Sequence, residues 1–74
     1  MKEVREVAEE YLGPGGVRVA GVQLCSGKEA FVLVQAPLGQ FSLQLLKTTG
    51  GEWAVAAEMD ASDYYDAVGK AEGG

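Results

Sequence analysis

The spacing of apolar residues predicts an amphipathic helix at the start of this chain. In 2–12 they recur at the i, i+3, i+4, i+7 and i+8 positions of one helix face, and acidic residues occupy the other face. The apolar positions are Val4, Val7, Ala8, Tyr11 and Leu12. Gly13 permits a left-handed cap and Pro14 cannot continue a helix, so the helix is expected to end there.

From position 17 onward the apolar residues follow the two-residue period of β-strands. Turn-forming residues interrupt this pattern at Ser26-Gly27, at Pro37 and in 48–51. The expected strands are 17–24, 29–36, 40–46 and 52–59. Because each connection is short, consecutive strands are expected to pair, which predicts an antiparallel meander over 17–59.

The last segment predicts a short acidic helix over 60–69. Asp60 is a favourable N-cap, and Asp63 falls in the first turn, where a carboxylate suits the helix dipole. Gly69 ends the helical pattern. Residues 70–74 are expected to form a frayed tail.

These elements predict a single α+β domain over 1–74, with the N-terminal helix packed on a four-stranded antiparallel meander and a short C-terminal helix after it. A helix followed by a meander resembles the layout of cystatin-like folds, in which a helix packs across one curved sheet. The resemblance is one of architecture only. No residue motif accompanies it, and a fold alone assigns no function.

Strict alternation makes both faces of the first two strands apolar, which one helix cannot cover. The first strand would place Val17 and Val19 opposite Ala20, Val22 and Leu24. The fourth strand would place Trp53, Val55, Ala57 and Met59 on one face. Two explanations compete without excluding each other: the C-terminal helix covers the second face of the sheet, or that face is an intermolecular surface.

An intermolecular apolar surface would include Phe31, Leu33 and Val22. A chain of 74 residues buries only about 60 per cent of its unfolded surface, so its core is small without further support. A homodimer or a tight hetero-complex is therefore expected.

The net charge of −5 resides at the two ends of the chain. Segment 2–12 carries −2 and segment 58–74 carries −4, whereas 13–57 carries +1. This distribution argues against nucleic acid or an anionic membrane as a direct partner. No stretch within 1–30 resembles a signal peptide, and the longest apolar run is too short to span a bilayer, so a cytoplasmic location is expected.

The residue types present give little support to catalysis. Without histidine, neither a Ser-His-Asp nor a Cys-His arrangement can form within the chain. Cys25 is interpreted as a small filler residue near a hairpin, although Lys28 could lower its pKa. Asp60, Asp63 and Asp66 have the spacing of one helix face and not that of a calcium loop. We expect no enzyme activity, no metal and no cofactor.

Two adjacent tyrosines among aspartates are the most suggestive local sequence. Consecutive helical residues point about 100 degrees apart, so at least one of the rings of Tyr64 and Tyr65 is expected to be exposed. A tyrosine framed by carboxylates suits recognition of arginine or lysine. The candidate partner-binding residues are Asp60, Asp63, Tyr64, Tyr65 and Asp66.

The sequence favours a small acidic, non-catalytic protein-binding module, an inhibitor, accessory subunit or adaptor that engages a basic surface on a larger protein. Phage-type anti-defence inhibitors and nucleic-acid mimics belong to this class. The alternative is a small-ligand-binding domain with an apolar pocket between helix and sheet. That pocket would be lined by Tyr11, Phe31, Phe41 and Trp53.

Overall fold

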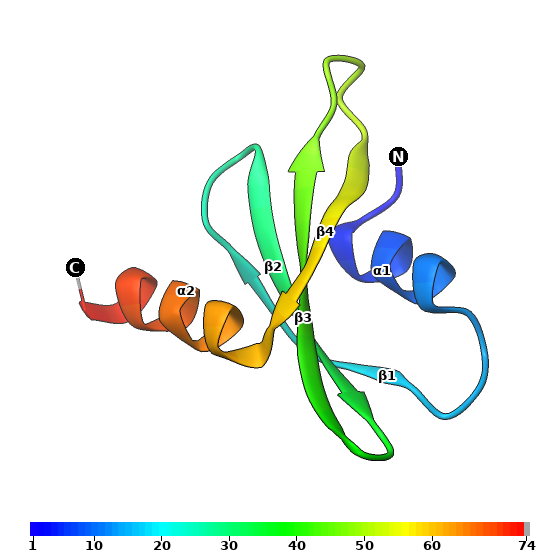
Figure 1. The fold of residues 1–74 in the computed structure, drawn as a ribbon. Helices are drawn as coiled ribbons and strands as arrows, with labels where there is room; N and C mark the ends of the chain where they lie inside the picture. Colours follow the sequence, from blue (N-terminus) through cyan, green and yellow to red (C-terminus); the bar gives the residue numbers. More distant parts are fainter. Residues whose placement is uncertain (74) are drawn as a thin grey trace.

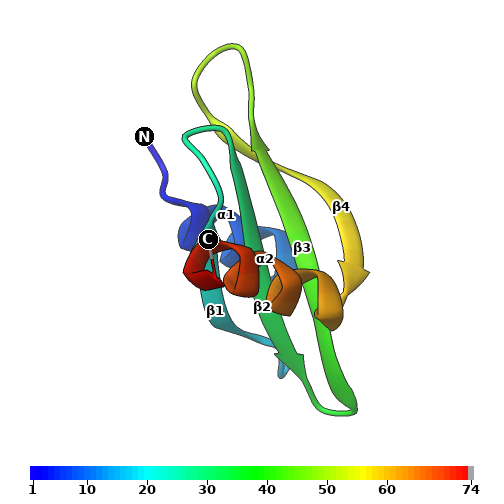
Figure 2. The same ribbon diagram turned by 90° about the vertical axis from the view of Figure 1, so that its left-hand side faces the viewer.

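A computed structural model describes residues 1–73 as a four-stranded antiparallel sheet with one helix on each side (Figures 1 and 2). The elements are α1 (Val4–Leu12), β1 (Arg18–Leu24), β2 (Glu29–Ala36), β3 (Gly39–Lys47), β4 (Trp53–Asp60) and α2 (Ala61–Gly73). The strands lie in the order β1-β2-β3-β4. The predicted α+β layout, a helix on an antiparallel meander followed by a second helix, is confirmed.

The main core lies between α1 and one face of the sheet. Val4 and Ala8 of α1 are buried against the inward-facing residues of the central strands. Those residues are Ala30, Val32, Val34, Leu43 and Leu45. Because α1 also contacts both edge strands, β1 and β4, the sheet curves around it.

Each edge strand contains a β-bulge, and the two bulges change which residues face α1. In β1 the pairing skips Ala20, between Val19 and Gly21, and in β4 it skips Ala56. An extra residue in one strand bends it and shifts the alternation of its side chains by one. The faces predicted from strict alternation are therefore wrong for the residues of β1 and β4 that follow the bulges.

The bulge in β1 moves Val22 and Leu24 to the same face as Val19. Val22 pairs with Val32 and packs against the main core. The opposite face of β1 carries Gly21 and Gln23 instead, so this strand does not have the second apolar face expected from the sequence.

The bulge in β4 separates four residues that alternation had placed together. Trp53 and Val55 pack against the main core, whereas Ala57 and Met59 lie on the other face, where Met59 pairs with Ser42. The same shift brings Glu58 to the α1 face, opposite Leu43.

The second face of the sheet is covered by α2, which runs across all four strands (Figure 2). Leu33 is only 6 per cent exposed beneath this layer, and Ala67 of α2 is also buried. Ser42 is buried on this face, and its hydroxyl donates a hydrogen bond of 2.6 Å to the carbonyl oxygen of Asp60. Of the two explanations for the apolar second face, the covering helix is the one observed.

Helix α2 is longer than predicted, because it continues through Gly69 to Gly73. A glycine inside a helix costs about 1 kcal/mol relative to alanine, which weakens a helix without ending it. Lys70, Ala71 and Glu72 are good helix formers, and no proline follows Gly69. The expectation of a frayed tail is wrong for 70–73, and its last residue, 74, lies outside the described part of the chain.

Tyr64 of α2 packs closely against β1 at Gly21. A Cβ atom at this position would overlap the hydroxyl oxygen of Tyr64 and lie 3.0 Å from its Cζ. Glycine at position 21 leaves room for the Tyr64 ring, and any residue with a side chain there would force Tyr64 to move.

We predict that Gly21→Ala lowers the free energy of unfolding by about 1 to 3 kcal/mol, because the added methyl group forces Tyr64 out of its place. Gly27→Ala is the matched control, since a Cβ there would meet no atom within 4 Å. Urea denaturation of both variants measures the difference. Equal stability of the two would contradict the close contact.

Candidate functional site

Three carboxylates line an open hollow at the junction of β4 and α2. Glu58 and Asp60 come from the end of β4, and Asp63 comes from the first turn of α2. The hollow is open to solvent, has a volume of about 520 Å³ and is lined by these residues with Phe41 and Met59. We call these five residues the acidic hollow.

Local structure explains why these groups meet. Phe41 pairs with Asp60 across the β3–β4 ladder, and Met59 pairs with Ser42. Because α2 begins at Ala61, directly after the strand, its first turn returns Asp63 to the same corner of the sheet. The hollow therefore combines three carboxylates with two apolar side chains, Phe41 from the α1 face of the sheet and Met59 from the α2 face.

The carboxylates of Asp60 and Asp63 are not neutralised by the rest of the described chain. Within residues 1–73, the two ion pairs are Lys2–Glu10 at 2.6 Å and Arg5–Glu9 at 4.0 Å. Both lie at the N-terminal end of the chain. The acidic hollow therefore presents negative charge that is free to meet a cation from outside.

The third carboxylate of the hollow is oriented by α1. The Tyr11 hydroxyl donates a hydrogen bond of 2.6 Å to Oε2 of Glu58. This hydrogen bond raises the pKa of Tyr11 above its ordinary value, and partial burial and the negative charge of Glu58 act in the same direction. The neutral phenol therefore holds the Glu58 side chain in place at neutral pH.

The two adjacent tyrosines have different surroundings, which agrees with the expectation that one ring would be exposed. Tyr64 is half-buried against Gly21, whereas Tyr65 is 51 per cent exposed and its hydroxyl donates to Oε1 of Gln40 at 3.1 Å. The two rings lie edge to face, with 5.4 Å between their centroids. Asp66, which directly follows Tyr65 in α2, is also exposed.

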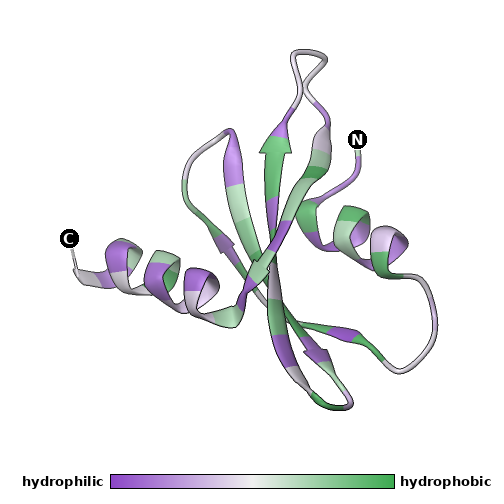
Figure 3. Ribbon diagram, in the orientation of Figure 1, coloured by the Kyte–Doolittle hydropathy of each residue, from purple (hydrophilic) through white to green (hydrophobic). Residues whose placement is uncertain are grey.

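The five candidate partner-binding residues are therefore only partly brought together. Asp60 and Asp63 share the acidic hollow, Tyr65 and Asp66 are exposed on α2, and Tyr64 packs against the sheet. Figure 3 shows that α2 is mainly hydrophilic or neutral along its length, in contrast to the hydrophobic segments of the strands.

The three residues of the expected apolar interface do not share a surface. Phe31 and Leu33 lie on the face covered by α2, and Leu33 is buried there. Val22 lies on the opposite face because of the bulge in β1.

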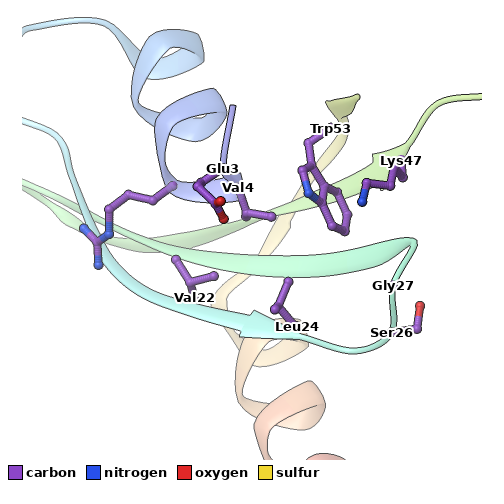
Figure 4. A pocket seen from close by; sticks show the side chains of 9 residues that line it. Glu3, Val4, Val22, Leu24, Ser26, Gly27, Lys47 and Trp53 are labelled. Carbon is purple, nitrogen blue, oxygen red and sulfur yellow. The ribbon is translucent and has the colours of Figure 1, made fainter. Parts of the chain in front are cut away.

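The structure has a groove between α1 and the sheet, but its place and its lining differ from those of the pocket expected from the sequence. Of its four expected residues only Trp53 contributes, since Phe31 is on the other face, Phe41 lines the acidic hollow and Tyr11 reaches Glu58. The observed groove has a volume of about 580 Å³ and lies between the start of α1 and the ends of the strands (Figure 4). Its lining includes Val4, Val22, Leu24, Lys47 and Trp53.

Sequence reasoning did not single out Glu58 and Met59 as site residues, and it expected Phe41 to line a different pocket, together with Tyr11, Phe31 and Trp53. Period-two alternation placed Glu58 and Met59 on the wrong faces, because the bulge at Ala56 has no sequence signal. Phe41 was assigned to an apolar strand face, and only the strand pairing shows that it ends beside Asp60.

Cys25 is exposed, yet its surroundings do not favour the thiolate. Partial desolvation raises the pKa of its thiol, the Glu29 carboxylate raises it further, and Lys70 of α2 opposes them. The cation near the thiol is therefore Lys70, and not the Lys28 considered from the sequence. A raised pKa lowers the reactivity of a cysteine at neutral pH.

Within residues 1–73, no group of three or more His, Cys, Asp or Glu side chains could hold a metal ion. None of the described helices is long and apolar enough to cross a membrane.

No protein-family model, curated protein or solved structure matches the chain. Function is therefore inferred from the geometry and charge of these residues.

We predict that Tyr11 ionises at a higher pH than an ordinary tyrosine, and that Glu58→Gln moves its pKa back toward about 10. Because the folded-state pKa is raised, the stabilisation by this group is fully present below the unfolded pKa. It is lost as the pH rises through the folded pKa. NMR titration of the tyrosine Cζ signals, assigned with Tyr11→Phe and with Tyr65→Phe as control, measures the shift. A Tyr11 pKa unaffected by Glu58→Gln would contradict the hydrogen bond.

Proposed function

We propose that this protein is a non-catalytic binding module whose acidic hollow engages a basic side chain on the surface of a larger protein. The observation that carries the proposal is the combination of three carboxylates with two apolar side chains, while no cation of residues 1–73 forms an ion pair with Asp60 or Asp63. Such a site is complementary to arginine in charge and offers it apolar contacts.

The chemistry of the hollow suits an arginine from a partner. Carboxylates accept paired hydrogen bonds from the planar guanidinium group, and these charge-assisted bonds are the strong ones. The ring of Phe41 and the thioether of Met59 offer the apolar contact that the guanidinium face and the aliphatic stem prefer. Tyr65 and Asp66, exposed on α2, would extend the contact surface.

The charge distribution supports a partner with a basic surface. Segment 58–74 carries a net charge of −4, which attracts a basic protein during diffusion and makes association sensitive to salt. An inhibitor, accessory subunit or adaptor would each use such a surface. Among examples of the class, a phage-type anti-defence inhibitor fits a local acidic hollow better than a nucleic-acid mimic, which needs charges repeated at the spacing of phosphates.

The proposed assembly is a hetero-complex. The homodimer expected from the sequence stays a prediction, but the apolar face that suggested it is covered by α2. We propose neither nucleic acid nor membrane as a direct partner, because the surface charge is predominantly negative. A cytoplasmic location is proposed as well, in keeping with one free cysteine.

We predict that Asp60→Asn with Asp63→Asn weakens binding of a hexa-arginine peptide about tenfold at low salt, since hydrogen bonds to charged groups are lost. Asparagine retains the ability to cap α2, so folding should be little affected. Glu52→Gln with Glu72→Gln is the control, because it removes the same net charge at exposed positions outside the hollow.

Isothermal titration at low and high salt measures both pairs of substitutions. The control pair should lose much less affinity than the hollow pair, and high salt should reduce the difference. Equal losses for the two pairs would show that net charge alone binds the peptide, which would contradict the proposal. Affinity capture from the source organism, with the wild type and the hollow pair as baits, would then identify the partner.

A further inference from the structure

The groove beside Trp53 exists because α1 is shorter than the strands that it covers. A helix of nine residues is about 13 Å long, whereas a strand of nine residues such as β3 spans about 30 Å. The apolar face of the sheet therefore continues beyond the first turn of α1. Leu24, at the end of β1, is 57 per cent exposed although it is on the same face as the main core.

Apolar side chains from three elements form the walls of this groove. Val4 comes from α1, Val22 and Leu24 come from β1, and Trp53 comes from β4. Figure 4 shows the Trp53 ring standing between Val4 and Lys47, with Val22 and Leu24 on the strand below. The volume of about 580 Å³ lies within the range of small-molecule sites, about 300 to 1,000 Å³.

The end of the groove near Trp53 is positively charged. Nζ of Lys47 lies 5.2 Å from the centroid of the Trp53 ring, and no carboxylate of residues 1–73 forms an ion pair with it. Lys28 is exposed on the neighbouring hairpin, where its carbonyl oxygen accepts a hydrogen bond of 2.8 Å from the Lys47 amide. An anionic group would meet unpaired positive charge at this end.

The other end of the groove has a different charge. Glu3, directly before α1, lines it on the far side of the Trp53 ring from Lys47 (Figure 4). Arg5 also lines the groove, but its guanidinium is 4.0 Å from Glu9. A ligand with one negative group would therefore place it at Lys47, and a second negative group would meet Glu3.

We propose that this groove binds an amphipathic monoanion, a small molecule with an apolar chain or ring and a single carboxylate. The apolar body lies on Val22, Leu24 and Trp53, and the carboxylate pairs with Lys47. The proposal is independent of the acidic hollow, because Phe41 and Lys47 mark opposite ends of β3.

Trp53 provides the measurement, since it is the single tryptophan of the chain. Its fluorescence is titrated, below micelle formation, with decanoate, decanol, decyltrimethylammonium and decanedioate. These four probes have the same ten-carbon body or one close to it and differ in charge. Decanoate is expected to bind about fivefold tighter than decanol, as for a partly exposed ion pair. The cation and the dianion are both expected to bind more weakly than decanoate.

Substitutions then assign the charge preference to particular side chains. Lys47→Met keeps an unbranched apolar side chain beside Trp53, and it should remove the advantage of decanoate over decanol. Lys70→Met is the control, since it removes the same charge on α2, which covers the opposite face. Glu3→Gln should reduce the discrimination against decanedioate.

The outcome that would overturn the proposal is equal affinity of the wild type for decanoate and decanol, or no binding of either. Equal effects of Lys47→Met and Lys70→Met would overturn it as well. Circular dichroism checks that each variant folds. If Lys47→Met does not fold, the affinities of the wild type and of Glu3→Gln for decanoate and decanedioate are compared instead. Equal affinity of the wild type for these two probes would then overturn the proposal.

Discussion

The packing of α1 against one face of the sheet is the contact on which the other features of this structure depend. The helix has only nine residues, and Val4 and Ala8 are the two that it buries fully. To enclose such a short helix, the sheet curves and both edge strands bend, and each bend occurs at a β-bulge. The bulge in β1 turns Val22 toward α1, and the bulge in β4 turns Glu58 toward Tyr11. Both candidate sites therefore follow from the way the sheet closes around α1.

The two candidate sites lie at opposite ends of β3 and have opposite charge. At one end Phe41 lies among Glu58, Asp60 and Asp63, and at the other end Lys47 lies over Trp53. About 20 Å separates these ends along the ladder, about two and a half times the screening length of about 8 Å at physiological salt. At physiological salt, each site can therefore be tested by charge substitutions without a large electrostatic effect on the other.

The second helix gives this small chain a second buried layer. Without α2, Leu33 and Phe31 would be exposed on the face opposite α1, and the sheet would present an apolar surface to other proteins. The layer is closely fitted where Tyr64 meets Gly21, but it does not enclose Tyr65 or Asp66. One side of α2 therefore packs on the sheet and stabilises it, and the other side exposes Tyr65 and Asp66 to solvent.

Local periodicity in the sequence determined the class of the fold, the order of its elements and most of their bounds. The period of α1 and the runs of valine, leucine and phenylalanine in the strands depend on neighbours in the chain, so they can be read without the structure. The faces of β1 and β4 could not be read in this way. Ala20 and Ala56 are the extra residues of the bulges, and a small apolar residue looks the same in a bulge as in regular pairing. Only pairing with the adjacent strands decided that Val22 joins the core and that Glu58 joins the acidic hollow. The bulges belong to a sheet that curves around α1, and this curvature is a property of the tertiary packing.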